Sequence, residues 1–443
     1  MRYEPFDAAF FTENRARLAA RLPKGAIAIV HSHDLITTSA DGTLPFRQNS
    51  DFFYLTGIEQ EESVLILDPS APEPGDRARL FLRETSDLIR IWEGDRLTRE
   101  QAVVRSGAAR VEWTQNFEPA LRRLLRQRHT VYLNANEHPR SGAEFIGRDD
   151  RFRRQLQDWY PRHRYERLAP WLHELREIKR APELAATREA CRITSDGFRR
   201  LLRFVRPGVT EFEIEAELLH EFLRQRSRGF AYTPIIASGA NACVLHYIEN
   251  NAVCQDGELL LLDIAAEYAR YNADLTRTIP VNGRFTPRQR AVYEAVLRVM
   301  RLCIRELLRP GIDLRKEYQP AVGRAVEQEL IGLGLLDPAK VAEERAKDGT
   351  PDEVKEERRL YRKYFMHGTS HSLGLDVHDV QRRDRLVKEG MVFTVEPGIY
   401  VREEGLGVRL ETEVVVGAHG NEDLMPDAPI EPDEIETLMQ AGR

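Results

Sequence analysis

Three of the chain's twelve histidines lie in one short stretch, HGTSHSLGLDVHDV, at residues 367–380. His367, His371 and His378 are separated there by small and polar residues, including two glycines. One interpretation is a polar surface loop with scattered imidazoles. The other is a site that uses neutral imidazoles as metal ligands and proton carriers, a chemistry that histidine performs near neutral pH. The stretch alone does not decide between them, so partners must come from elsewhere in the chain.

The segment GELLLLDIAAEYARYNADLTRTIPV (257–281) places two aspartates in apolar surroundings. Asp263 lies inside an apolar run, and Asp274 follows eleven residues later. If the chain reverses around Tyr268 and Ala269, the two carboxylates face each other on antiparallel strands, where like charges destabilise the pair. An unpaired carboxylate is also costly to bury. A bound cation would resolve both problems.

A second segment, MVFTVEPGIYVREEGLGVRLETEVVV (391–416), repeats this arrangement with glutamates. Two strands are predicted about a turn at 403–405, and this register would set Glu396 opposite Glu411. Either hairpin alone is compatible with ordinary salt bridging. Two hairpins that share the same costly feature favour a metal site.

Four carboxylates and one imidazole form an oxygen-rich donor set that suits Mn, Co or Zn. Four acids exceed the need of one divalent ion, so we expect two ions about 3.5–4 Å apart, bridged by carboxylates and able to hold a bridging hydroxide. One histidine of the 367–380 stretch would supply the nitrogen ligand, and the other two would remain for chemistry. A zinc site of the helical HExxH type is excluded, because Gly368 stands where its catalytic glutamate would be.

The elements that must position these residues fall into two predicted domains, residues 1–174 and 175–443, because 443 residues exceed one ordinary core. The first part alternates helical segments such as PALRRLLRQR with short apolar runs that read as buried strands of an α/β domain. These runs are AIAIV (26–30), SVLILD (63–68), RARLFLRE (77–84) and TVYLNAN (130–136). The boundary is expected where WLHELREIKRAPE turns into a long helical pattern.

The second part repeats itself weakly, since residues 198–218 resemble residues 299–322. In each copy an amphipathic helix ends at Arg-Pro-Gly, and Thr210 or Asp313 is placed to cap the next helix. Thr210 is followed three residues later by Glu213, which is a capping-box signature. Coincidence is an alternative, because Arg-Pro-Gly is a common helix stop. An internal duplication is the other interpretation, since each copy precedes a strand-rich region with paired acids.

Composition narrows the classes of function. The net charge is −6 and no basic stripe stands out, which argues against a nucleic-acid partner. No run of eighteen apolar residues is present, so no membrane span is predicted, and the N-terminus lacks a secretory signal pattern. The four cysteines form no CxxC pair and are expected to be buried thiols of a cytoplasmic protein. The highly charged segment 339–363 is predicted to be an exposed helix or a mobile insertion.

Asp263, Asp274, His371, Glu396 and Glu411, in this order, resemble the five-ligand signature of the dinuclear metallopeptidases with the pita-bread fold. Within that family the nearest likeness is to the aminopeptidase P branch. The supporting strings are RQNSDFFYLTG, IWEG, ASGANACVLHYIEN, ADLTRTIPVNGRFT, HGTSHSLGLDVHDV and TVEPGIY. The resemblance implies an α/β N-terminal domain followed by an α+β pita-bread domain with an internal pseudo-twofold repeat.

The resemblance also implies roles for individual residues. Asp274 and Glu411 would bridge two divalent ions, with Mn²⁺ expected and Co²⁺ or Zn²⁺ as alternatives. Asp263 would complete one ion, His371 and Glu396 the other, and Glu396 would also accept a proton. The residues expected around these ligands are three histidines that contact the peptide, a tyrosine close to the metals and a pair that orients Asp263: His246, His367, His378, Tyr232, Tyr400 and Arg409.

For the N-terminal domain the resemblance implies oligomerisation and a narrowed entrance to the metal site. We therefore expect a homodimer or homotetramer, in which Trp92 of the string IWEG contributes to substrate binding. A simple core position is the alternative for this tryptophan. The expected substrates are peptides with proline in second place, from which the N-terminal residue is released.

Three other members of the fold family are alternatives. Prolidase, a dipeptidase for Xaa-Pro, shares every ligand, but its usual HGxGH pattern differs from the HGTSH here. A metal-free binding protein and a creatinase-type enzyme are disfavoured, because all five ligands are present. The sequence departs from relatives at Ser372, where Trp is frequent, in a short loop between Glu396 and Glu411, and in the compact segment 381–390. These departures concern pocket walls and leave the length of the substrate open.

Overall fold

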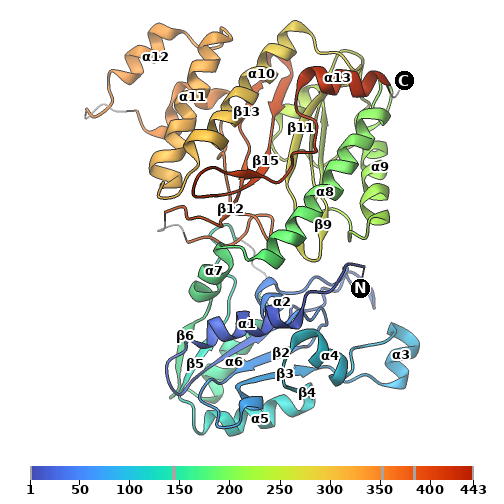
Figure 1. Cartoon of the computed structure of the whole chain (residues 1–443), viewed down its shortest axis with the longest axis vertical. Coiled ribbons are helices and arrows are strands. Elements are labelled where there is room, and N and C mark those ends of the chain that lie inside the picture. Colours follow the sequence, from blue (N-terminus) through green and yellow to red (C-terminus); the bar gives the residue numbers. More distant parts are fainter. Residues whose placement is uncertain (1, 142–145, 351–353, 383–385, 442–443) are drawn as a thin grey trace. The chain divides into compact units, whose positions relative to one another are not determined.

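The computed structural model describes residues 2–141, 146–350, 354–382 and 386–441 (Figure 1). The chain divides into two compact units. The N-terminal unit comprises Pro5–Arg176, and the C-terminal unit comprises Glu177–Arg443 together with the residues that precede Pro5.

The N-terminal unit is built on one mixed six-stranded sheet. Its strands are β1 (Ala26–His31), β2 (Val64–Leu67), β3 (Ala78–Leu82), β4 (Arg110–Trp113), β5 (Thr130–Leu133) and β6 (Arg164–Arg167). They lie in the order β4-β3-β2-β1-β5-β6, with β1 antiparallel to β2 and parallel to β5. The helices of this part of the chain are α1 (Ala8–Ala19), α2 (Ser50–Thr56), α3 (Asp87–Glu93), α4 (Arg99–Ser106), α5 (Phe117–Leu125), α6 (Arg148–Trp159) and α7 (Ala169–Glu177).

The four apolar runs predicted as strands are confirmed as β1, β2, β3 and β5. Their side chains are buried because helices cover the sheet, and Ile27, Ile29 and Phe81 share one core with residues of α5 and α6. The sequence did not predict β4 or β6. Both are edge strands with charged residues, RVEW and RYER, which is how sheet edges resist pairing with other chains.

The C-terminal unit combines helices with short antiparallel sheets (Figure 1). Its helices are α8 (Ala181–Phe204), α9 (Glu211–Arg224), α10 (Pro287–Leu302), α11 (Gln319–Gly332), α12 (Pro338–Arg345) and α13 (Pro432–Ala441). Its strands are β7 (Ile235–Ser238), β8 (Leu259–Ile264), β9 (Glu267–Tyr268), β10 (Tyr271–Asn272), β11 (Leu275–Pro280), β12 (Val392–Val395), β13 (Gly398–Val401), β14 (Leu406–Arg409), β15 (Thr412–Val415) and β16 (Glu422–Asp423). One large apolar core joins these elements.

Both copies of the predicted repeat contain helical segments on either side of Arg-Pro-Gly. In the first copy α8 ends before Arg-Pro-Gly, and Thr210 caps α9 in a capping box with Glu213. In the second copy α10 and a π-helical turn precede Arg-Pro-Gly, and Asp313 accepts hydrogen bonds from two backbone amides at the start of the next helical segment. Both predicted caps are confirmed by these hydrogen bonds. Each copy is followed later in the chain by an antiparallel hairpin with two of the acids.

The charged segment 339–363 is more closely packed than the sequence suggested. It contains α12 and two short 3₁₀ turns, and residues 351–353 lie outside the described part. Arg359 and Tyr361 are buried, and Arg345 forms a two-pronged ion pair with Glu327 of α11. The prediction of an exposed helix is confirmed for α12, where only Val341 and Glu344 are buried. It is wrong for Arg359 and Tyr361, which are buried, because Arg359 pairs with Asp348 of the same segment.

Two further expectations concern the whole chain. No helix within the described residues is long and apolar enough to cross a membrane. The four cysteines are buried with free thiols, as expected.

Candidate metal centre

Strands β8 and β11 form the hairpin that carries the two aspartates. The chain reverses at Ala269 and Arg270, which both adopt positive φ angles of 51° and 76°. Asp263 therefore pairs with Thr276, and Asp274 lies diagonally one step away on the same face. The prediction that the two aspartates directly oppose each other is wrong. The turn lies one residue later in the chain than predicted, and this changes the partner of Asp263 from Asp274 to Thr276.

Strands β12 to β15 form the second hairpin, and here the predicted register is confirmed. Val395 pairs with Thr412, and Gly398 pairs with Arg409. Glu396 and Glu411 lie between these two pairs and so face each other. The reversal occupies residues 402–405 and ends at Gly405, whose φ of 60° suits glycine.

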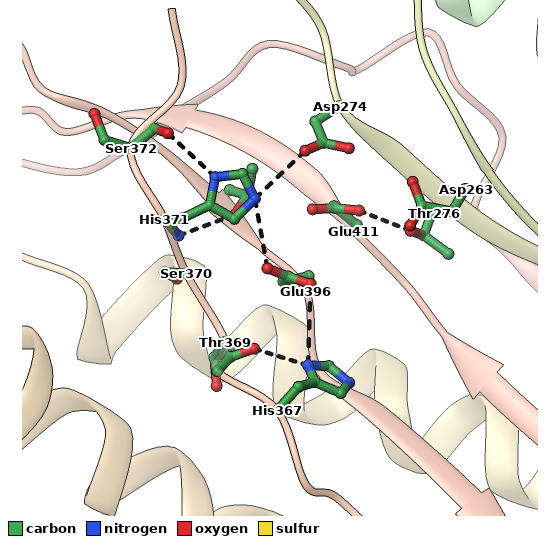
Figure 2. A network of polar contacts seen from close by, with 12 residues as sticks. Asp263, Asp274, Thr276, His367, Thr369, Ser370, His371, Ser372, Glu396 and Glu411 are labelled. Carbon is green, nitrogen blue, oxygen red and sulfur yellow. Dashed lines mark hydrogen bonds and ion pairs between the residues drawn. The ribbon is translucent and has the colours of Figure 1, made fainter. Parts of the chain in front are cut away.

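The two hairpins bring their acids together around His371 (Figure 2). Its Nε2 atom lies 3.4 Å from Oδ2 of Asp274 and 3.6 Å from Oε1 of Glu396. On the other side of the ring, Nδ1 lies 3.1 Å from the carbonyl oxygen of Ser372, which leaves Nε2 as the lone-pair donor. Ligand atoms of Asp274, His371 and Glu411 all lie within 4.8 Å of one another. These three side chains could therefore hold a metal ion.

Asp263 is held by two partners from different elements. Arg409 donates from Nη2 to Oδ2 of Asp263 at 2.6 Å and from Nη1 to the hydroxyl of Tyr400 at 3.0 Å. The hydroxyl of Tyr232 lies 2.6 Å from Asp263 and 2.7 Å from Asp274, so it spans the two carboxylates. The resemblance implied that these three side chains surround the metal ligands, and the structure places them around Asp263.

The remaining histidines surround the same pocket, whose volume is about 380 Å³. The ring of His378 packs edge-on against His371 with centroids 4.4 Å apart. His367 contacts the Tyr400 hydroxyl through Nε2 at 2.8 Å and the Gly368 carbonyl through Nδ1 at 2.8 Å. His246, on the segment between β7 and β8, also lines the pocket. The apolar part of the lining is Ile235, Leu245, Ile248 and Val377.

Trp92 lies in the other unit, on α3. Its side chain is 79% exposed, and Leu88 and Ile91 on the same helix are exposed as well. The alternative of a core tryptophan is therefore wrong.

A model of metallopeptidase family M24 matches residues 185–418, and a model of the aminopeptidase P N-terminal domain matches residues 11–132. The chain is 35% identical to the Xaa-Pro aminopeptidase of Escherichia coli strain K12, with 98% of each chain covered. The chain belongs to metallopeptidase family M24.

Solved structures agree with this membership of M24. Aminopeptidase PepP from Pseudomonas aeruginosa is 32% identical, with 99% of each chain covered and a TM-score of 0.88. Zinc-substituted E. coli aminopeptidase P in complex with product is 33% identical, with a TM-score of 0.85 over 99% of this chain and all of that one. The resemblance to the pita-bread metallopeptidases and the two-part fold are thereby confirmed.

The electrostatics of the M24 site fit divalent cations. Burial, and then the charge of neighbouring Asp274, raise the pKa of Glu411 well above its ordinary value. Burial also raises the pKa of Glu396 to about 7 and raises the pKa of Asp263 in spite of Arg409. Burial lowers the pKa of His371, but the hydrogen bond to Asp274 and the charge of Glu396 outweigh this, and the net direction is upward. Metal ions would supply the positive charge that these carboxylates lack.

Two residues beside the candidate metal ligands were not predicted from the sequence. Thr276 donates its hydroxyl to Oε2 of Glu411 at 2.7 Å and accepts from Nε of Arg409 at 3.2 Å. Glu413 is completely buried, accepts the backbone N–H of Asp274, and accepts from the thiol of Cys191 at 2.6 Å. The alternation of β15 provided a signal for Glu413, since it lies two residues after Glu411 and therefore on the same face.

Proposed function

We propose that this chain releases the N-terminal residue from peptides that carry proline in second place. The observation that carries the proposal is the convergence of four carboxylates and one imidazole in a pocket bounded by further histidines. The likeness to Xaa-Pro aminopeptidase over nearly the whole chain supports the substrate class. A metal-free binding protein would not need to keep all five ligands.

The proposed metal ligands divide between the two ions. Asp274 and Glu411 would hold both ions, Asp263 would complete one, and His371 with Glu396 would complete the other. Bound divalent ions would supply Lewis-acid chemistry that activates water and polarises a peptide carbonyl. Mn²⁺ is the proposed resident ion because carboxylate oxygens dominate the donor set, and Co²⁺ or Zn²⁺ would suit the imidazole.

The chain's own groups would handle protons and charge around the peptide. Burial raises the pKa of Glu396 to about 7, which suits a group that accepts and returns a proton near neutral pH. Burial and the charge of Arg409 lower the pKa of His367 to about 3, so this imidazole stays neutral. His246, His367 and His378 are proposed to contact the peptide and to stabilise charge that develops on its carbonyl oxygen.

The proline specificity follows from the chemistry of the bond. An X-Pro bond lacks an N–H group and its ring fixes φ, so an enzyme for it needs a pocket shaped for the ring. The apolar side chains Leu245, Ile248 and Val377 provide such a surface beside the ligands.

A matched substrate series tests this proposal. Purified protein with added Mn²⁺ is assayed on Xaa-Pro, Xaa-Pro-Yaa and Xaa-Ala-Yaa, with a chelated sample as control. We expect the proline tripeptide to be cleaved fastest and the chelated sample to be inactive. Preference for the dipeptide would move the chain to prolidase, and equal cleavage of the alanine series would remove proline specificity.

We also propose a division of labour between residues 1–174 and 175–443. The N-terminal domain would mediate a homodimer or homotetramer and narrow access to the site, with Trp92 contributing to substrate binding. The exposed apolar side chains of α3, which are 66–79% exposed, support a protein partner for this helix. Light scattering tests the assembly, and a fully active monomer would contradict it. The four buried thiols are compatible with the proposed cytoplasmic location.

A further inference from the structure

A buried carboxylate at the start of α9 collects hydrogen bonds from one distant segment. The side chain of Glu211 is completely buried. Its Oε1 accepts from the backbone N–H of Ser238 at 2.8 Å, from the Ser238 hydroxyl at 2.8 Å and from Nδ2 of Asn241 at 3.4 Å. Its Oε2 accepts from the hydroxyl of Tyr247 at 2.8 Å and from the backbone N–H of Ala252 at 2.9 Å. Glu211 therefore joins both ends and the middle of the segment 238–252.

This segment, which we call the 238–252 loop, forms one wall of the metal pocket. Leu245, His246 and Ile248 of the loop line the pocket. Tyr247 lies between them in sequence, is buried, and directs its hydroxyl to Glu211. The side chains that face the pocket are thus interleaved with the one that anchors the loop.

The hydrogen bonds of Glu211 are not explained by the needs of its own helix. The N-terminus of α9 is already capped by Thr210 and Glu213, which exchange hydrogen bonds in a capping box. All five donors to Glu211 come from the loop, and all are neutral groups. Burying a carboxylate is costly, and several hydrogen bonds to its charged form are needed to offset that cost. A neutral polar residue could not satisfy five donors at once.

We propose that Glu211 is a positioning residue that fixes the 238–252 loop and thereby holds His246 against the metal site. The role of His246 in this inference rests on the proposed function. The anchoring of the loop by Glu211 does not depend on that function. Glutamine at position 211 would keep the size of the side chain and place an amide NH₂ against donors of the loop. The amide NH₂ of glutamine would then face N–H and O–H donors of the loop, which it cannot accept from.

A double-mutant cycle tests the coupling to His246. His246→Ala should lower kcat/KM by about 10²–10³-fold, as expected for loss of a group that contacts the reacting peptide. Glu211→Gln should lower it by about 10²-fold, since small displacements of such groups have effects of that size. If Glu211 acts through His246, the double variant should be no slower than the slower single variant. Bound metal, measured by elemental analysis, should be unchanged in all three.

The control is Glu217→Gln on the same helix, where the carboxylate pairs with Arg200 at 2.6 Å and does not contact the loop. It should leave kcat/KM unchanged. A general loss of stability from Glu211→Gln would lower the melting temperature but would give losses that add to those of His246→Ala. Additive losses would therefore overturn the proposal. If Glu211→Gln does not fold, Tyr247→Phe removes one anchor without removing the carboxylate and is put through the same cycle.

Hydrogen exchange provides a measurement that needs no substrate. In the metal-free wild type the amides of Ser238 and Ala252 should be protected, and both should exchange faster in Glu211→Gln while amides within α9 do not change. Unchanged exchange at both positions would overturn the anchoring. If the wild type failed to cleave proline peptides while exchange rose as expected, the proposed function would be wrong and the anchor would stand.

Discussion

The two acidic hairpins of the C-terminal unit deliver carboxylates to one site in different ways. On β8 and β11 the aspartates are diagonal neighbours, and the hydroxyl of Tyr232 lies between them. On β12–β15 the glutamates are directly opposed. Glu396 faces imidazoles, and Glu411 accepts a hydroxyl donated from β11.

The difference separates a carboxylate that is fixed by hydrogen bonds from one that we propose exchanges a proton. Asp263 is held by Arg409 and Tyr232, which leaves its carboxylate little freedom. Glu396 has imidazole neighbours, and burial raises its pKa to about 7 in the metal-free protein. Under the proposed function, one hairpin would serve mainly as a scaffold for charge, and the other would combine a ligand with a proton acceptor.

The largest effect should come from removing the carboxylates that both ions would share. Asp274→Ala and Glu411→Ala should each lower kcat by roughly 10³-fold or more, because Lewis-acid stabilisation of a transition state is worth several kcal/mol. Metal content should fall in both, and His371→Ala should weaken one ion more than the other. The control for elemental analysis and kinetics is Glu404→Ala. Glu404 is a surface acid in the turn of the glutamate hairpin and pairs with Arg288 of α10. Two retained metals and near-normal turnover in Asp274→Ala would sink the assignment.

Glu396→Gln and Asp263→Asn should distinguish a proton acceptor on one hairpin from a metal ligand on the other. Loss of a proton acceptor typically costs about 10²–10⁴ in rate, so kcat should fall within that range even at saturating metal. Asp263→Asn, by contrast, should act mainly through weaker metal binding and should be partly rescued by excess Mn²⁺. Equal rescue of both variants by metal would erase the distinction between scaffold and proton acceptor.

The pH dependence of stability tests the raised pKa of Glu396 without any substrate. The pKa of Glu396 is raised from its ordinary 4.5 to about 7, so the metal-free folded protein binds more protons than the unfolded chain in this window. Its contribution to stability is present below pH 4.5 and is lost as the pH rises through about 7. His367, with a lowered pKa, acts in the opposite direction below pH 6.5. The melting temperature of chelated wild type should therefore fall more steeply between pH 5 and 8 than that of Glu396→Gln, and added Mn²⁺ should reverse the fall.

The hairpins also show what the sequence could and could not predict. The register of Glu396 and Glu411 was predictable because Gly405 marks the end of the turn. The register of Asp263 and Asp274 was not, because Ala269 and Arg270 adopt positive φ and neither residue type signals such a turn. Asp263 and Asp274 still lie on one face of the sheet, since a shift of two residues keeps a side chain on the same face.

Residues behind the ligands were harder to find. Thr276 is an ordinary strand threonine by type, and only its partners give it a role. The buried charges of the 339–363 segment, such as Arg359, resembled surface charges because their partners lie on α11 or across the segment itself. Local sequence patterns contain no information on partners that tertiary packing supplies.

Arg409→Lys should remove side-chain hydrogen bonds that join the glutamate hairpin to the aspartate hairpin. The guanidinium contacts Asp263 and Tyr400 together, and it donates to Thr276. A lysine ammonium cannot reproduce this fork, so activity and metal affinity should fall by about 10–100-fold, as is typical for groups that orient metal ligands. Arg288→Lys, at the surface pair with Glu404, is the control and should have no effect. Metal affinity measured by calorimetry is the decisive readout, since unchanged affinity would mean that Arg409 does not orient Asp263.

The smallest effect is expected at Thr276, where the scaffold hairpin touches the other one. Thr276→Val keeps the shape of the side chain but removes the donor to Glu411 and the acceptor for Arg409. The loss should be about tenfold in metal affinity, at the lower end of the range for such partners, because other groups still hold both residues. Thr276→Ser keeps the hydroxyl and should retain wild-type affinity. If Val and Ser behave alike, the Thr276 hydroxyl does not contribute to the coupling between the hairpins.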